Sequence, residues 1–148
     1  MTSTLLVLAC LMGACGVGLA AAAAHAAPAA GLDSAAYLLL FHAVAVLGAA
    51  SLTGQELLWR PLGLVAMAGF VAGGALFAGD AAMRAFAGHR LFPMAAPTGG
   101  MLLILGWLVL AAAAIIAMTR VTRDPQKIAD IADRARAQMP LSRARRDR

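Results

Sequence analysis

Ala96-Pro97-Thr98-Gly99-Gly100 opens an apolar stretch that continues through Trp107 to Met118. Pro97 fixes φ near its helical value and lacks the N–H that a first turn leaves unpaired, so it favours a helix start. None of the residues from the two glycines to Met118 is ionisable. At about 1.5 Å rise per residue, the stretch is long enough to cross the roughly 30 Å hydrocarbon core of a bilayer. We therefore predict a transmembrane helix over about 98–118.

The composition of the whole chain agrees with a protein that lies in lipid. Of the 148 residues, 62% are hydrophobic and only 13% are charged, which exceeds the apolar content of ordinary soluble domains. Three more apolar runs of spanning length precede the one that Pro97 opens, at about 4–24, 35–52 and 61–79. The sequence thus predicts an all-α polytopic membrane protein, a bundle of four transmembrane helices, with its membrane domain over residues 1–119.

The first apolar run has some features of a secretory signal peptide, because Ala-His-Ala-Ala-Pro follows it. It begins without Lys or Arg, however, and it is about twice as long as the hydrophobic region of a typical signal peptide. We predict a retained helix. Cys10, Ala14, Gly18 and Ala22 recur at intervals of four, which predicts a ridge that packs closely on another helix and buries the two cysteine thiols.

The formal charge of +5 is located at the end of the chain. Residues 120–148 hold nine of the twelve Lys and Arg and four of the seven acidic residues, which accounts for the whole surplus. By the positive-inside rule we expect a cytoplasmic tail, and four spans then place both termini on the cytoplasmic side of a cell inner membrane. The connecting loops point weakly the other way, because Arg84 and Arg90 fall on the outer side.

The tail itself combines a helical pattern with a basic end. Apolar residues recur at helical spacing from Ile128 to Met139, which predicts a short amphipathic cytoplasmic helix that ends at Pro140. Four arginines lie among the last six residues, so we expect this end to bind anionic lipid; a solvated tail is the plainer alternative. Nucleic acid is not an expected partner, because the tail has no aromatic residue on which bases would stack.

Few polar residues fall within or near the ends of the predicted spans. His42 lies about 12 Å into the membrane when counted from Ser34, and an ionisable residue at this depth indicates a function by default. A neutral histidine that hydrogen-bonds to a neighbouring helix is the plainer interpretation. Asp80 and Arg84 are four residues apart with the acid first, the favourable order for a helical ion pair, and His25 falls at the same level. A polar cluster of these three side chains is therefore a second hypothesis.

These residues do not form a recognisable metal or catalytic motif. His25, His42 and Asp80 carry groups that bind metals, but no two of them sit at ligand spacing. A haem between the two histidines is disfavoured because one lies at the membrane rim and the other near mid-depth. No nucleophile and base pair, metal motif or phosphate loop appears, so we expect no enzyme activity, no metal and no cofactor.

Glycines predict where the helices approach one another most closely. Gly69 and Gly73 form a GxxxG motif, which we interpret as packing within the bundle rather than between two copies of the chain. Ala96 and Gly100 are also four apart and predict a second packing face at the start of the last span. The candidate packing positions of this last span are Pro97, Gly99, Gly100 and Trp107.

Four sequence blocks together resemble a known family of small membrane proteins. They are Gly13–His25 ending in Ala-His, Phe41-His42-Ala-Val-Ala, Gly74-Ala-Leu-Phe77-Ala-Gly79, and Ala96–Gly100 followed by Gly106-Trp107. Over about residues 10–118 the chain resembles the small membrane protein family catalogued as domain of unknown function 423, which has a eukaryotic transmembrane relative. The first block is richer in alanine than the family's usual Gly-Ala-x-Gly-Ala-His, and a Leu-Leu pair replaces the frequent Tyr-Gln before the second. The resemblance implies a four-helix inner-membrane protein without an established activity.

Two functional hypotheses follow. The first is a structural or accessory subunit of a larger inner-membrane complex or a homo-oligomer, because small-residue faces are abundant, charge is scarce and the tail is able to dock. The second is a small transporter or channel component for a proton, ion or small solute, with His42 and the level of His25, Asp80 and Arg84 as its polar path. We favour the first.

Overall fold

The computed structural model describes residues 2–25, 31–123 and 125–138, and these residues are helical apart from short connections. The helices are α1 (Thr2–His25), α2 (Leu32–Gly54), α3 (Arg60–Ala87), α4 (Ala95–Arg123) and α5 (Pro125–Gln138). The first four are long and apolar enough to cross a membrane. The predicted all-α bundle of four long apolar helices with a short C-terminal helix is confirmed.

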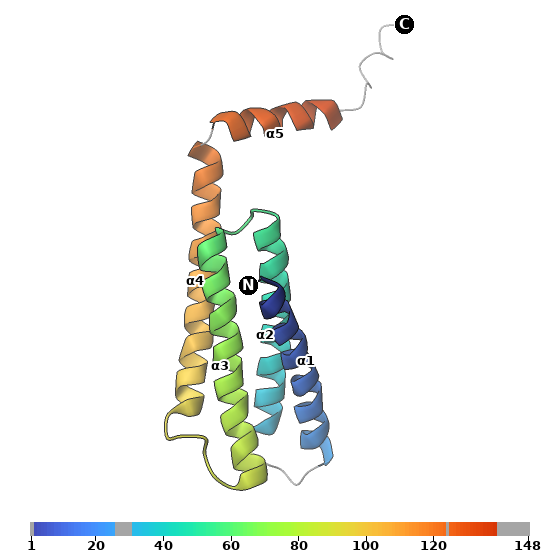
Figure 1. Ribbon diagram of the computed structural model, residues 1–148, viewed down its shortest axis with the longest axis vertical. Coiled ribbons are helices and arrows are strands. Elements are labelled where there is room, and N and C mark those ends of the chain that lie inside the picture. Colours follow the sequence, from blue (N-terminus) through green and yellow to red (C-terminus); the bar gives the residue numbers. More distant parts are fainter. Residues whose placement is uncertain (1, 26–30, 124, 139–148) are drawn as a thin grey trace, which may run out of the picture.

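The four long helices run side by side, and each packs mainly on its neighbour in the chain (Figure 1). The most extensive contact joins α3 to α4, followed by α1 with α2 and α2 with α3, while α1 touches α3 less. Consequently α2 and α3 are the more buried pair, and α1 and α4 leave most of their surface to lipid.

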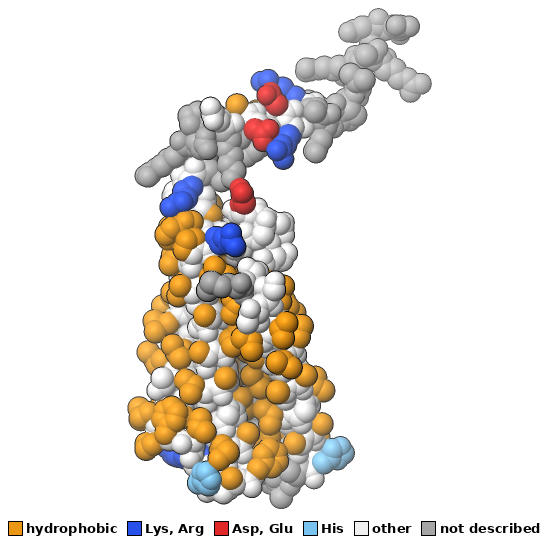
Figure 2. Space-filling model, in the orientation of Figure 1, with side chains coloured by type: hydrophobic (Ala, Val, Ile, Leu, Met, Phe, Trp, Pro, Cys, Tyr) orange, Lys and Arg blue, Asp and Glu red, His pale blue; other side chains and the backbone are white. Residues whose placement is uncertain are grey.

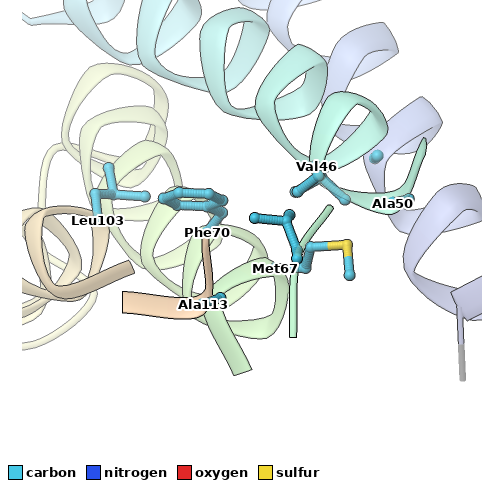
Figure 3. Packing of buried hydrophobic residues seen from close by; sticks show 9 residues of the cluster. Val46, Ala50, Met67, Phe70, Leu103 and Ala113 are labelled. Atoms are coloured by element: carbon cyan, nitrogen blue, oxygen red, sulfur yellow. The ribbon is translucent and has the colours of Figure 1, made fainter. Parts of the chain in front are cut away.

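The core lies around α3. Phe70 and Met67 of α3 are completely buried, between Val46 of α2 on one side and Leu103 and Ala113 of α4 on the other (Figure 3). Between helices in a bilayer the surrounding lipid is as apolar as the core, so close van der Waals packing rather than the hydrophobic effect holds this layer together.

Glycine makes the α3–α4 contact possible. A Cβ atom on Gly73 would lie 2.8 Å from the carbonyl oxygen of Gly99, so the two backbones touch there. The prediction that Ala96 and Gly100 form the packing face of the last span is wrong by one residue. Ala95 and Gly99 are the buried pair, whereas an added Cβ on Gly100 would meet nothing within 4 Å.

The small-residue ridge predicted for the first helix is also placed differently. Cys10, Ala14 and Gly18 are exposed, and Cys15 is exposed as well, so neither thiol is buried in the bundle. The face that packs on α2 carries Ala9, Met12 and Gly16 instead. A Cβ on Gly16 would come within 2.8 Å of Leu40, which shows how closely these two helices approach.

All four long helices extend beyond the predicted spans, and the third and fourth extend furthest. The third continues past residue 79 to Ala87 and stops where Gly88 adopts a left-handed backbone conformation (φ 72°), a common way to end a helix. The fourth continues past residue 119 to Arg123, so the expected boundary between membrane domain and tail falls inside a helix.

The tail helix α5 leaves the end of α4 at a steep angle and runs across the direction of the bundle (Figure 1). Charged side chains gather at this end, while hydrophobic side chains cover the bundle below it (Figure 2). Pro140, the predicted end of the tail helix, and the basic stretch from Arg143 to Arg148 lie outside the described residues.

Candidate functional site

His42 is held in the core by hydrogen bonds at both ring nitrogens. Its side chain is buried on α2, with Nδ1 2.8 Å from the carbonyl oxygen of Leu38 and Nε2 3.3 Å from Nε1 of Trp107 on α4. Its ring also lies 5.3 Å from the ring of Phe70 on α3. We call His42, Phe70 and Trp107 the His42 cluster; it joins the three helices at one level.

The hydrogen-bond partners determine which tautomer of His42 fits. A carbonyl oxygen only accepts, so Nδ1 must carry the proton that it donates to Leu38. An indole N–H only donates, so Nε2 must be the bare nitrogen that accepts from Trp107. The neutral ring therefore uses both of its polar atoms. A second proton on Nε2 would remove the acceptor and bring two N–H groups face to face.

Gly106 explains how Trp107 reaches His42. A Cβ atom on Gly106 would lie 2.7 Å from the ring of Phe70, so only glycine lets this ring fit against α4. The centroid of the neighbouring Trp107 indole then lies 5.0 Å from that of the Phe70 ring, and its Nε1 reaches His42 on α2. Trp107 is half exposed, which places its outer edge in lipid while its N–H points into the core.

A second polar group lies at the end of the bundle that is remote from the tail. Asp80 is 3% exposed; its carboxylate pairs with Arg84 at 3.0 Å and accepts a hydrogen bond of 3.0 Å from the backbone N–H of Leu91. The expected ion pair thus forms, and it also fastens the α3–α4 connection to α3. His25 is exposed and forms no hydrogen bond or ion pair with any described residue, so the predicted three-residue cluster is reduced to Asp80 and Arg84.

The structure keeps the potential metal ligands apart. Among the described residues there is no group of three His, Cys, Asp or Glu side chains that could hold a metal ion. His42 lies within the bundle, whereas His25 is exposed at the end of α1. The arrangement therefore offers a satisfied polar layer and a loop anchor rather than a ligand set.

Comparison with known proteins agrees with the four-block resemblance. Residues 12–100, more than half of the 148-residue chain, match the model of the family described as "Protein of unknown function (DUF423)". The chain belongs to this family. No curated protein and no solved structure matches the chain.

The DUF423 match covers His42, Phe70, Asp80 and the glycines of the α3–α4 contact up to Gly100. It ends before Gly106 and Trp107, although the resemblance was expected to extend to about residue 118. Within the His42 cluster, His42 and Phe70 thus lie in the matched region, while the hydrogen-bond donor Trp107 lies beyond it.

Sequence reasoning missed the contacts at the tail end of this DUF423 protein. The backbone N–H of Trp59 donates to the carbonyl oxygen of Ala113 at 3.0 Å, and the Arg120 guanidinium lies 4.7 Å from the centre of the Trp59 ring. Arg60-Pro61 marks the start of α3, but nothing in the sequence pattern identifies Arg120 as the partner of Trp59.

Proposed function

We propose that this DUF423 protein is a non-enzymatic accessory subunit of a larger membrane complex in the cell inner membrane, with both termini on the cytoplasmic side. It packs against a transmembrane helix of its partner through the side of the bundle formed by α1 and α3. The surplus of Lys and Arg after residue 119 supports the orientation.

The observation that carries this proposal is an apolar groove between α1 and α3, of about 580 Å³. Small residues line both of its walls: Gly18 and Ala22 on α1, and Ala75, Gly79 and Ala82 on α3. Hydrophobic side chains cover much of the bundle in the view of Figure 2. Small residues on facing walls let the backbone of another helix approach closely, which is how helices associate in lipid. Gly18 and Ala22, two residues of the ridge predicted for the first helix, are thus available to a partner outside the bundle.

The His42 cluster supports an accessory role over transport. A proton or ion path needs a side chain that changes its charge or partners during a cycle. His42 instead gives one hydrogen bond and accepts another, within a packed aromatic layer. It therefore serves to join helices.

Purification from native membranes in mild detergent tests the proposal. Gly18→Leu fills the groove without an internal clash, because a Cβ there meets nothing within 4 Å. Gly48→Leu is the matched control, since that glycine is equally open but lies on α2, outside the groove. We expect one membrane protein to co-purify at constant ratio with wild type and Gly48→Leu and to be lost with Gly18→Leu.

Equal recovery of that protein with both variants would refute a partner in the groove. Absence of any stoichiometric partner, with lipid alone retained, would refute the accessory role.

A further inference from the structure

A second hollow opens at the tail end of the bundle, where the α2–α3 connection meets α4. Its volume is about 570 Å³. Its polar lining comes from every long helix and from the connection: Thr2, Thr53, Glu56, Trp59, Arg60 and Arg120. The third candidate span begins at Arg60 and the fourth ends at Arg120, so the hollow lies at the membrane boundary.

Two arginines give the hollow its charge. Within the described part of the chain neither Arg60 nor Arg120 forms an ion pair, in contrast to Arg84, Arg134 and Arg136. Glu56 also lines the hollow, and the two cations outnumber it. In addition, α3 begins at Arg60 without a side-chain cap, so the positive end of its dipole lies at the same place.

Contacts with Trp59 hold the Arg120 guanidinium in position. Trp59 is fixed to α4 through its hydrogen bond to Ala113, and the Arg120 guanidinium lies over its ring. Stacking uses the face of a guanidinium and leaves the N–H groups along its edge to bind an oxyanion in bidentate fashion. Leu58, next to Trp59, is buried, so this end of the connection packs into the bundle, while residues 55–57 are exposed.

We propose that this hollow binds the phosphate of an anionic phospholipid from the leaflet on the tail side, with Arg60 and Arg120 as its cationic contacts. The lipid source follows from the position of the hollow. Ala50, Leu58 and Ala117 form its apolar wall, against which an acyl chain can lie. Basic pockets between transmembrane helices at this level suit lipid phosphates. The site is separate from the tail and does not depend on the accessory role.

Lipid retention measured by native mass spectrometry tests this site on the full-length protein in mild detergent. Phosphatidylglycerol and phosphatidylcholine are offered together, and wild type is expected to retain phosphatidylglycerol preferentially. Arg60→Gln combined with Arg120→Gln should lower that preference about tenfold, the equivalent of one charge-assisted hydrogen bond of roughly 1.4 kcal/mol. Arg134→Gln combined with Arg136→Gln removes the same charge from α5 and should leave the preference unchanged.

One further variant and one competing ligand complete the experiment. Arg120→Lys keeps the charge but loses the planar guanidinium that stacks on Trp59 and could bind a phosphate through two N–H groups. It should lower the preference about threefold, with an unfolding temperature close to that of wild type, which tests the site even if the double variant is unstable. Soluble glycerol phosphate should not displace the bound lipid. The proposal would be overturned if glycerol phosphate displaced the lipid, or if Arg120→Lys left the preference for phosphatidylglycerol unchanged. It would also be overturned if the double variant in α5 lost as much of this preference as the double variant in the hollow.

Discussion

Gly73 of α3 and Gly99 of α4 meet backbone to backbone. A Cβ on Gly73 would lie 2.8 Å from the Gly99 carbonyl oxygen, and a Cβ on Gly99 would lie 2.7 Å from that of Gly73. Because neither oxygen can move without moving its helix, this pair sets the distance between α3 and α4. The GxxxG motif of α3 therefore faces α4, within the same chain.

Alanine substitution at neighbouring glycines measures how much this contact contributes. Gly99→Ala must push α3 and α4 apart, and we expect it to lower the free energy of unfolding by about 1–3 kcal/mol. Gly100→Ala is the matched control, because its Cβ meets nothing within 4 Å and alanine favours a helix by up to about 1 kcal/mol. Thermal unfolding in detergent compares the two. Equal stability of the variants would show that the backbones are not in contact.

The register of this contact was the part that the sequence did not determine. Composition and run length sufficed for the four spans, since the bilayer demands long apolar helices whatever their order, and the helical spacing of apolar residues sufficed for the tail helix. Spacing by four, in contrast, occurs on several faces of a glycine- and alanine-rich helix. We therefore predicted Ala96 with Gly100, whereas Ala95 with Gly99 has the same spacing and is the pair that packs on α3.

The candidate site was also only partly predictable, because spacing along one helix reveals contacts within that helix but not between helices. His42 was identified from its depth, and hydrogen bonding to another helix was the plainer hypothesis, but its partner comes from residue 107. Spacing along one helix carries no information about contacts so distant in sequence. The ion pair of Asp80 and Arg84 was predicted, because these residues are four apart on one helix. The additional bond from Asp80 to Leu91 depends on how the connection folds back.

Asp80 should control the order of the α3–α4 connection. Asp80→Ala removes the acceptor of the Leu91 N–H and the partner of Arg84, so we expect amide hydrogen exchange at Leu91 to quicken at least tenfold. Asp33→Ala is the control, since it removes an exposed carboxylate from the first turn of α2. Exchange in the α2–α3 connection should stay unchanged in both. Unaltered exchange at Leu91 would mean that the carboxylate does not fasten the connection.

Cysteine labelling decides the membrane orientation. With Cys10 and Cys15 replaced by alanine, we expect Ala132→Cys on α5 to be shielded from an impermeant reagent in intact cells and His89→Cys to react. Both positions are exposed in the structure, so access depends on the side of the membrane. The opposite labelling pattern would place both termini outside and invert the orientation.

Reconstitution separates transport from a structural role of His42. Glutamine has one acceptor and donors but does not titrate, so His42→Gln can keep hydrogen bonds without carrying a proton. We expect no pH-dependent flux through vesicles that contain wild type, none after the substitution, and similar unfolding temperatures. Flux in wild type that disappears in a folded His42→Gln protein would make His42 part of a transport path.

A double-mutant cycle measures the bond between His42 and Trp107 directly. Trp107→Phe keeps the ring but removes the N–H donor, which leaves Nε2 of His42 without its partner. Combined with His42→Leu, it should show a coupling free energy of about 0.6–1.7 kcal/mol, between the average and the largest value found for hydrogen bonds between membrane helices. The same cycle with Phe41→Leu is the control, because Phe41 is 70% exposed on α2. A coupling for His42 no larger than for Phe41 would show that the indole does not hold the histidine, and that shape alone joins α2 to α4 at this level.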